Sequence, residues 1–153
     1  MIQRIQTLYL AIVVILTSAL FYTRLVVFST SKNIYTMFYN GIFTGEEDSG
    51  DLVMKITAFT ILLFVSVIIG VITIFLYKRR LIQIRVAALN IGLQLGLTAL
   101  IYFFAKTAGK DIDAVFSFNY PVVFPLISVV LLIMAIKAIG KDEALIRSMD
   151  RIR

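Results

Sequence analysis

The stretch ITAFTILLFVSVIIGVITIFLY, residues 56–77, carries no charged side chain over 22 consecutive positions. A membrane-spanning helix needs about 20 mostly apolar residues, because each residue advances about 1.5 Å through a hydrocarbon core about 30 Å thick. The chain contains four such charge-free windows: Ile5–Thr23, Ile56–Tyr77, Val86–Ala105 and Ala114–Ile136. The sequence therefore predicts an all-α membrane protein, a bundle of four transmembrane helices.

The composition agrees with a membrane protein and excludes a soluble globular domain. Apolar residues make up 60% of the 153 residues, whereas soluble domains have about 45–50%. The segments between the windows are too short for a second domain, so we expect one integral membrane domain over residues 1–153. A cleaved signal peptide is the alternative for the first window, but that window is long and no A-x-A cleavage site follows it.

Basic side chains are distributed unevenly between the windows. Ten of the 15 Lys and Arg residues lie before residue 5, between residues 78 and 85, or after residue 136, and five lie in the other two connections. Since Lys and Arg accumulate on the cytoplasmic side of membrane proteins, we expect both termini in the cytoplasm. This asymmetry, rather than nucleic-acid binding, accounts for the net charge of +6. The lipid bilayer is the expected partner.

Cysteine and histidine are both absent from the chain. Thiolate chemistry and the commonest metal ligand and general base are therefore missing, so we expect no catalytic residue, metal or cofactor, and a non-enzymatic function. Two alternatives use carboxylates: a Ca²⁺ site at Glu46, Glu47 and Asp48, and an intramembrane enzyme using Asp111 and Asp113. Solvated turns are the simpler interpretation, because neither group follows a known ligand or catalytic spacing.

The connection Arg24–Lys55 is the longest segment outside the windows. Leu25–Ser29 and Ile34–Tyr39 are rich in β-branched and aromatic residues, and Asn40-Gly41 is a typical two-residue hairpin turn before Ile42–Thr44. We therefore predict a small, β-hairpin-like sheet of two or three strands over the outer end of the bundle.

The third window contains two ladders of residues spaced four apart. Small residues recur at Ala88, Gly92 and Gly96, and such spacing lets helix backbones approach closely in lipid. Ser66 and Gly70 in the second window have the same spacing, so we predict that they pack against this glycine face.

The second ladder is polar and consists of Asn90, Gln94 and Thr98. It is offset by two positions, about 200° around a helix, and so lies almost opposite the glycine face. One interpretation is interhelical hydrogen bonding that fixes the helix register. The other is a polar site for binding or conduction, although no ionisable side chain lies inside any window. A helix with two such faces is central in the bundle or faces a partner subunit, so a homo-oligomer is an open alternative.

The tail Lys137–Arg153 has helical spacing of apolar residues on one face. We predict a cytoplasmic amphipathic helix that docks on a protein partner or on its own bundle. Leu145 and Met149 are the expected anchors, with Arg147 and Arg151 at the rim.

Both ends of the sequence, MIQRIQTLYL at residues 1–10 and KDEALIRSMDRIR at residues 141–153, resemble a bacterial inner-membrane family known as domain of unknown function 4293. The resemblance implies a small, multi-pass, four-span protein of the bacterial inner membrane, and it supplies no activity, cofactor or catalytic residue.

Two functions follow from these observations as hypotheses. The first is an accessory or scaffold subunit of a larger cell-envelope complex of the secretion or insertion type. The second is a small oligomeric transporter or channel lined by the polar ladder, because four spans form a pore only with partner subunits.

Overall fold

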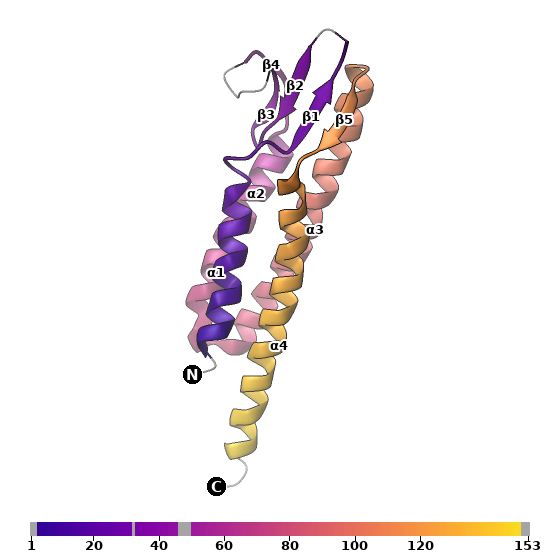
Figure 1. Ribbon diagram of the computed structural model, residues 1–153. Coiled ribbons are helices and arrows are strands. Elements are labelled where there is room, and N and C mark those ends of the chain that lie inside the picture. The colour runs from indigo at the N-terminus through magenta and orange to yellow at the C-terminus, as the bar shows by residue number, and fades with distance from the viewer. Residues whose placement is uncertain (1–2, 32, 46–49, 151–153) are drawn as a thin grey trace.

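The computed structural model describes residues 3–31, 33–45 and 50–150, with side chains described for residues 5–31, 33–45 and 50–144. Within these residues the chain forms four α-helices, two 3₁₀ turns and a five-stranded antiparallel sheet (Figure 1). The helices and turns are α1 (Gln3–Ala19), α2 (Thr57–Phe75), η1 (Leu76–Lys78), α3 (Arg80–Asp111), η2 (Tyr120–Val123) and α4 (Phe124–Asp150). The strands are β1 (Val26–Ser29), β2 (Ile34–Met37), β3 (Gly41–Thr44), β4 (Leu52–Lys55) and β5 (Val115–Phe118).

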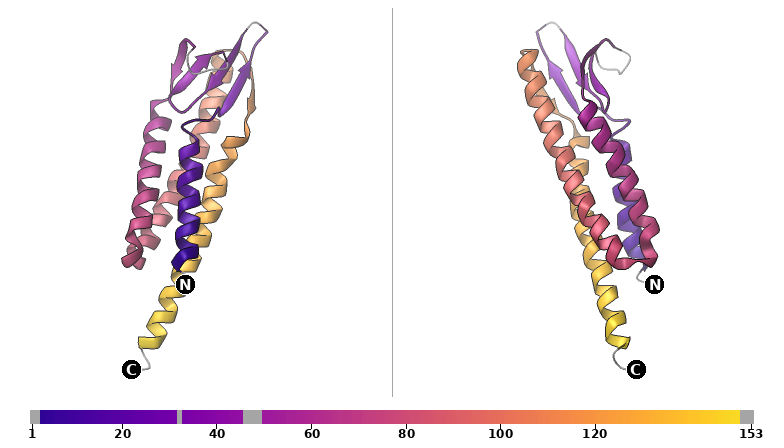
Figure 2. Two further views of the ribbon diagram at one scale, coloured as in Figure 1. Left: turned by 60° about the vertical axis from the view of Figure 1, so that its left-hand side comes forward. Right: turned by 180° about the vertical axis from the view of Figure 1, so that it is seen from behind.

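The helices form a bundle in which α1 and α3 each lie beside α2 and α4. The two ends of the chain and the α2–α3 turn lie at one end of the bundle, and the sheet lies at the other (Figures 1 and 2). At 32 residues, α3 is about 48 Å long, so it crosses the whole bundle and continues beside the sheet. We call the two ends the sheet end and the terminal end.

The sheet has the strand order β4-β3-β2-β1-β5. A turn between β2 and β3 forms where it was predicted, but shifted by one residue: Gly41 is the first residue of β3, and the Phe38 amide donates to its carbonyl at 2.9 Å, so Tyr39 and Asn40 make the turn. The far edge is built differently, because β5 comes from the connection between α3 and α4 and pairs with β1 in the register Val26↔Phe118. The sheet thereby ties two connections, far apart in the sequence, into one structure.

The prediction of an all-α four-helix bundle with a small hairpin-like loop is wrong. The regions predicted to be strands contain β1, β2 and β3, but β4 and β5 were not predicted. The reason for the second omission is physical: β5 lies inside the charge-free window Ala114–Ile136, where an apolar run suits a buried helix or a strand equally. Its pairing with β1 shows that this part of the window is sheet. The last helix therefore begins at Phe124 and continues without a break to Asp150.

Three helical segments among the described residues are long and apolar enough to cross a membrane: Thr57–Lys78, Arg80–Asp111 and Tyr120–Ala144. The apolar part of α1, Ile5–Ala19, is shorter. Large apolar side chains on the outside of the bundle, such as Ile61 and Ile68, are more than half exposed. Length and outward-facing apolar surface are both typical of helices in a lipid bilayer.

Candidate functional site

A layer of buried, uncharged polar side chains crosses the middle of the bundle. Each of its members is at most 1% exposed: Thr17 on α1, Ser66 on α2, Asn90 and Gln94 on α3, and Ser128 on α4. Along α3 this layer separates Ala87, in the apolar cluster toward the terminal end, from Leu97, in the apolar cluster below the sheet. The layer is the most concentrated polar feature inside the described bundle, and we call it the polar layer.

Gln94 is the centre of the hydrogen bonds in the polar layer. Its Nε2 donates to Thr17 Oγ1 at 2.8 Å and to Ser66 Oγ at 3.1 Å. Ser66 Oγ in turn donates to Asn90 Oδ1 at 2.9 Å. Because α1 lies diagonally across the bundle from α3, the long Gln94 side chain connects helices whose backbones are not neighbours. These bonds link α1, α2 and α3 at one level.

Some polar atoms of the layer have no partner among the described residues. The Nδ2 of Asn90, the Oε1 of Gln94 and the Oγ of Ser128 are covered by protein and make no hydrogen bond. A buried donor or acceptor left without a partner costs about 1–3 kcal/mol. The layer thus holds an unused donor, an unused acceptor and a hydroxyl that can serve as either.

Ser66 and Gly70 lie on the polar side of α3 rather than against its glycine face. Besides the Ser66–Asn90 bond, a Cβ added at Gly70 would stand 3.0 Å from Val14 Cγ2 and 3.5 Å from Asn90 Nδ2. Gly70 therefore allows α2 to lie close to α1 and to the Asn90 amide. The pairing predicted with the glycine face does not form within the chain.

The glycine face of α3 points mainly outward. Ala88 and Gly92 are exposed, and no described atom lies within 4 Å of a Cβ added at Gly92. Gly96 is half-buried, and its added Cβ would stand 3.2 Å from Leu62 Cδ2 of α2. Packing within this chain therefore requires a small residue at Gly96 but not at Gly92. The physical reason is that the polar ladder on the opposite face occupies the interior, away from lipid.

Thr98, the third member of the predicted polar ladder, does not join the interhelical bonds. Its side chain is half-buried, and its Oγ1 donates to the Gln94 carbonyl of the same helix at 3.1 Å. A hydroxyl that donates to a carbonyl of its own helix has a hydrogen-bond partner but does not connect two helices.

Further polar contacts lie near the terminal end and were not predicted. Gln6 Nε2 of α1 donates to Asp142 Oδ2 of α4, and both residues are at most 9% exposed. Gln83 Nε2 of α3 donates to the Thr73 carbonyl of α2 at 3.0 Å. Gln83 and Asp142 lie outside the charge-free windows, among other polar residues, so nothing in the sequence indicated that they would be buried. Thr17 and Ser128, by contrast, are polar residues inside charge-free windows and could have been singled out from the sequence.

The predicted docking tail lies largely outside the described side chains. The backbone of α4 is helical through Asp150, but the side chains of Leu145, Arg147 and Met149, and the whole of Arg151, lie outside the described part. The proposed Ca²⁺ ligands, residues 46–48, lie outside it as well.

Asp113 has a conformational role in the turn from α3 into β5. Its φ is +51°, a left-handed conformation that aspartate tolerates better than most residues, and the next amide, of Ala114, donates to the Gly109 carbonyl at 2.9 Å. A Cβ at Gly109 would stand 2.9 Å from Phe116 Cδ1, so this glycine allows β5 to fold back onto the end of α3. Asp111 is the last residue of α3.

The fold and the polar layer together define a class: a helical chain with membrane-spanning lengths, an uncharged polar layer inside the bundle and a sheet covering one end. The chain belongs to the family described as Domain of unknown function (DUF4293), whose profile matches residues 2–152. The resemblance inferred from the two ends of the sequence is confirmed, and the match also covers the middle. No curated protein matches the chain.

Proposed function

We propose that this protein is a non-enzymatic accessory or scaffold subunit of a larger cell-envelope complex of the secretion or insertion type. The observation that carries the proposal is the position of Asn90 and Gln94, both 0% exposed and bonded within one chain. Amides used in this way fix the register of neighbouring helices, as expected of a structural bundle. Polar groups that line a pore would instead face a water-filled lumen.

The sheet end supplies a surface suited to a protein partner. Strand β4 forms one edge of the sheet, and its Leu52 and Val53 side chains are each 45% exposed. An edge strand presents unpaired backbone groups, and a partner strand can satisfy them. This supports an assembly in which the sheet is the platform and the helices are the anchor.

The proposal includes the bacterial inner membrane, four spans and cytoplasmic termini. It is supported by Lys78, Arg79, Arg80 and Arg85, which follow α2 at the end of the bundle where both chain ends lie. Two of these residues lie in the connection and two lie in the first turns of α3, and such a concentration of basic residues at one end of a bundle is typical of the cytoplasmic side. The sheet then faces the outer side.

Purification in mild detergent, followed by mass spectrometry of associated proteins, tests the scaffold proposal. We expect a stable assembly larger than the monomer, and loss of a partner when Leu52 and Val53 are both replaced by Ser. Replacement of Ile61 and Ile68 by Ser is the matched control, because these exposed residues lie on the bundle rather than on the sheet. Recovery of a free monomer alone from native membranes would contradict the proposal.

Orientation is tested separately. A reporter active only outside the cytoplasm should work in the connection between β3 and β4 and fail at the C-terminus. The opposite pattern would reverse the proposed topology.

The tail extends the scaffold proposal to the cytoplasmic side, because α4 continues beyond the rest of the bundle at the terminal end (Figure 1). We expect Leu145 and Met149 to anchor it on a partner or on the bundle. Replacement of both by Ser should release a partner while the helices remain inserted. Retention of every partner would show that the tail is a solvated end.

The second candidate function is a small oligomeric transporter or channel. The unpaired Asn90 Nδ2, Gln94 Oε1 and Ser128 Oγ favour it, because unused hydrogen-bonding groups inside a bundle can bind a polar solute. Flux into reconstituted vesicles that disappears in Asn90→Leu and Gln94→Leu would support this function. Flux that is absent or unchanged by both substitutions would exclude it.

A further inference from the structure

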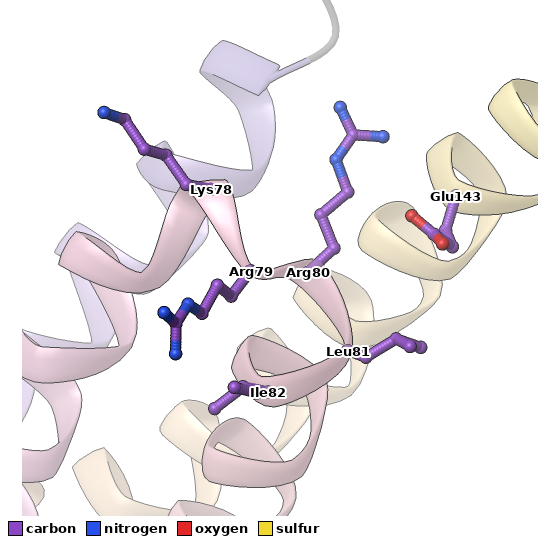
Figure 3. Close-up of a pocket in the computed structure, with 6 residues that line it drawn as sticks. All are labelled: Lys78, Arg79, Arg80, Leu81, Ile82 and Glu143. Carbon is purple, nitrogen blue, oxygen red and sulfur yellow. The ribbon is translucent and has the colours of Figure 1, made fainter.

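A second feature, distinct from the polar layer, lies at the terminal end where α2 turns into α3. An open pocket of about 470 Å³ is lined by Lys78, Arg79, Arg80, Leu81, Ile82 and Glu143. Its walls come from the α2–α3 turn and from α4 (Figure 3). We call it the basic pocket.

The guanidinium of Arg80 has hydrogen-bonding capacity that the described protein groups leave unused. Its Nη1 is covered by protein and makes no hydrogen bond, while the residue as a whole is half-buried and lines the pocket. Figure 3 shows the Arg80 and Lys78 side chains extending from the turn in a similar direction, with the Glu143 carboxylate facing Arg80 from α4. Arginine forms its strongest hydrogen bonds with phosphate and carboxylate oxygens.

The start of α3 provides backbone donors beside the same side chain. No side chain in the described part of the molecule caps this helix, and the Gln83 amide is the first to bond back, to the Arg79 carbonyl at 3.0 Å. The preceding amides in the first turn have no acceptor within the helix. Together with the helix dipole, these amides favour an anion next to Arg80.

The lining also indicates that this anion carries an apolar part. Leu81 is 52% exposed and Ile82 is 38% exposed, directly after the basic residues. Phe75 and Tyr77, just before them, are also more than half exposed. A charged group surrounded by outward-facing apolar side chains, at the end of membrane-length helices, matches a phospholipid better than a soluble ion.

We propose that the basic pocket binds the phosphate headgroup of an anionic phospholipid. The part of the Arg80 side chain that lines the pocket and the first-turn amides of α3 hold the phosphate, Lys78 lies at the rim, and an acyl chain lies along Leu81, which extends from the same side of the turn toward α4 (Figure 3). Glu143 limits the affinity, because its carboxylate repels the phosphate. This proposal requires a membrane protein but does not depend on the scaffold function.

The test uses the full-length protein in a mild non-ionic detergent. Short-chain phosphatidylglycerol is added, and the midpoint of thermal unfolding is followed, since a ligand that binds only the folded state raises it. We expect saturable stabilisation by phosphatidylglycerol and none by phosphatidylcholine with the same chains. Equal stabilisation by inorganic phosphate at the same concentration would assign the pocket to a soluble anion and overturn the lipid proposal.

Substitutions locate the site. Arg80→Gln should weaken the apparent affinity for phosphatidylglycerol by about tenfold, the loss expected for one charge-assisted hydrogen bond. The matched control is Arg85→Gln, which removes the same charge from an exposed position on α3 outside the lining, and should change the affinity by less than about threefold. Equal weakening by both variants would show general charge attraction and overturn the site.

A second variant keeps the test valid if Arg80→Gln fails to fold. Glu143→Gln removes the opposing charge and should tighten phosphatidylglycerol binding by about fivefold, the effect of about one unit charge near an anionic lipid. Unchanged or weaker binding in this variant would overturn the proposal.

Discussion

The two faces of α3 show how differently a membrane helix uses two sequence patterns with the same spacing. The face with Asn90 and Gln94 points into the bundle, where both side chains are fully buried. Asn90 accepts a hydrogen bond from Ser66 on α2, and Gln94 donates one to Thr17 on α1. The face with Ala88 and Gly92 points outward, and of its two glycines Gly96 alone lies close to a side chain of α2. Polarity thus outweighed small size in orienting the helix, because leaving an amide in lipid costs more than leaving a glycine there.

Gly70→Leu should have the largest effect on this comparison. Gly70 is buried, and a bulky side chain there meets Val14 on α1 and the amide of Asn90. Overpacking of this kind typically costs about 1–3 kcal/mol, and we expect the free energy of unfolding to fall by about 3 kcal/mol. The free energy of unfolding is measured by titrating sodium dodecyl sulfate into the detergent-solubilised protein and following circular dichroism. Val71→Leu, at an exposed neighbouring position, is the control and should have little effect.

Gln94→Leu should have the next largest effect. It removes two bonds that connect α3 with α1 and α2, and interhelical bonds in membranes contribute about 0.6–2 kcal/mol each. We expect a loss of about 1–2 kcal/mol in the same unfolding titration. Thr17→Val should add little in the Gln94→Leu background, because the bond between them is already gone. Additive effects of the two substitutions would contradict the direct bond.

Gly96→Leu should cost less, about 1 kcal/mol. The added Cβ would stand 3.2 Å from Leu62 Cδ2, the end of a flexible side chain that can move aside. Leu95→Ala is the control, since Leu95 is 49% exposed. A loss as large as that of Gly70→Leu would mean that α2 cannot adjust at this level.

Gly92→Leu should change the free energy of unfolding by less than about 0.5 kcal/mol, because the position is exposed and open. The free energy of unfolding in dilute detergent reports on the isolated chain. The oligomeric state in native membranes reports on contacts with a partner subunit. A large loss of stability in detergent would show that the outward face is covered after all. Loss of an oligomer in membranes with unchanged stability in detergent would identify the glycine face as a contact between subunits.

The sheet shows a similar difference between what a local pattern indicates and what a distant segment decides. The turn between β2 and β3 was predictable to within one residue because its signal is local: Asn40 and Gly41 interrupt two apolar runs, although Gly41 itself is the first residue of β3. Strand β5 was not predictable, because Val115–Phe118 has no charge and no turn signal that separates it from the following helix. Its strand conformation depends on β1, about 90 positions earlier in the chain. The basic pocket is a similar case, since Glu143 reaches it only through the packing of α4.

The sequence by itself determined that the chain contains long apolar helices, that the third apolar window carries uncharged polar residues, and that four of the 15 basic residues gather at residues 78–85. These properties depend on composition and on spacing along a single segment, and both can be read without knowing what lies beside that segment. Only the tertiary structure decided which face of α3 is buried, that residues 115–118 form a strand, and which side chains meet Gln94. Each of these depends on a partner from a distant segment, because burial and backbone pairing are energies between elements and not properties of either element alone.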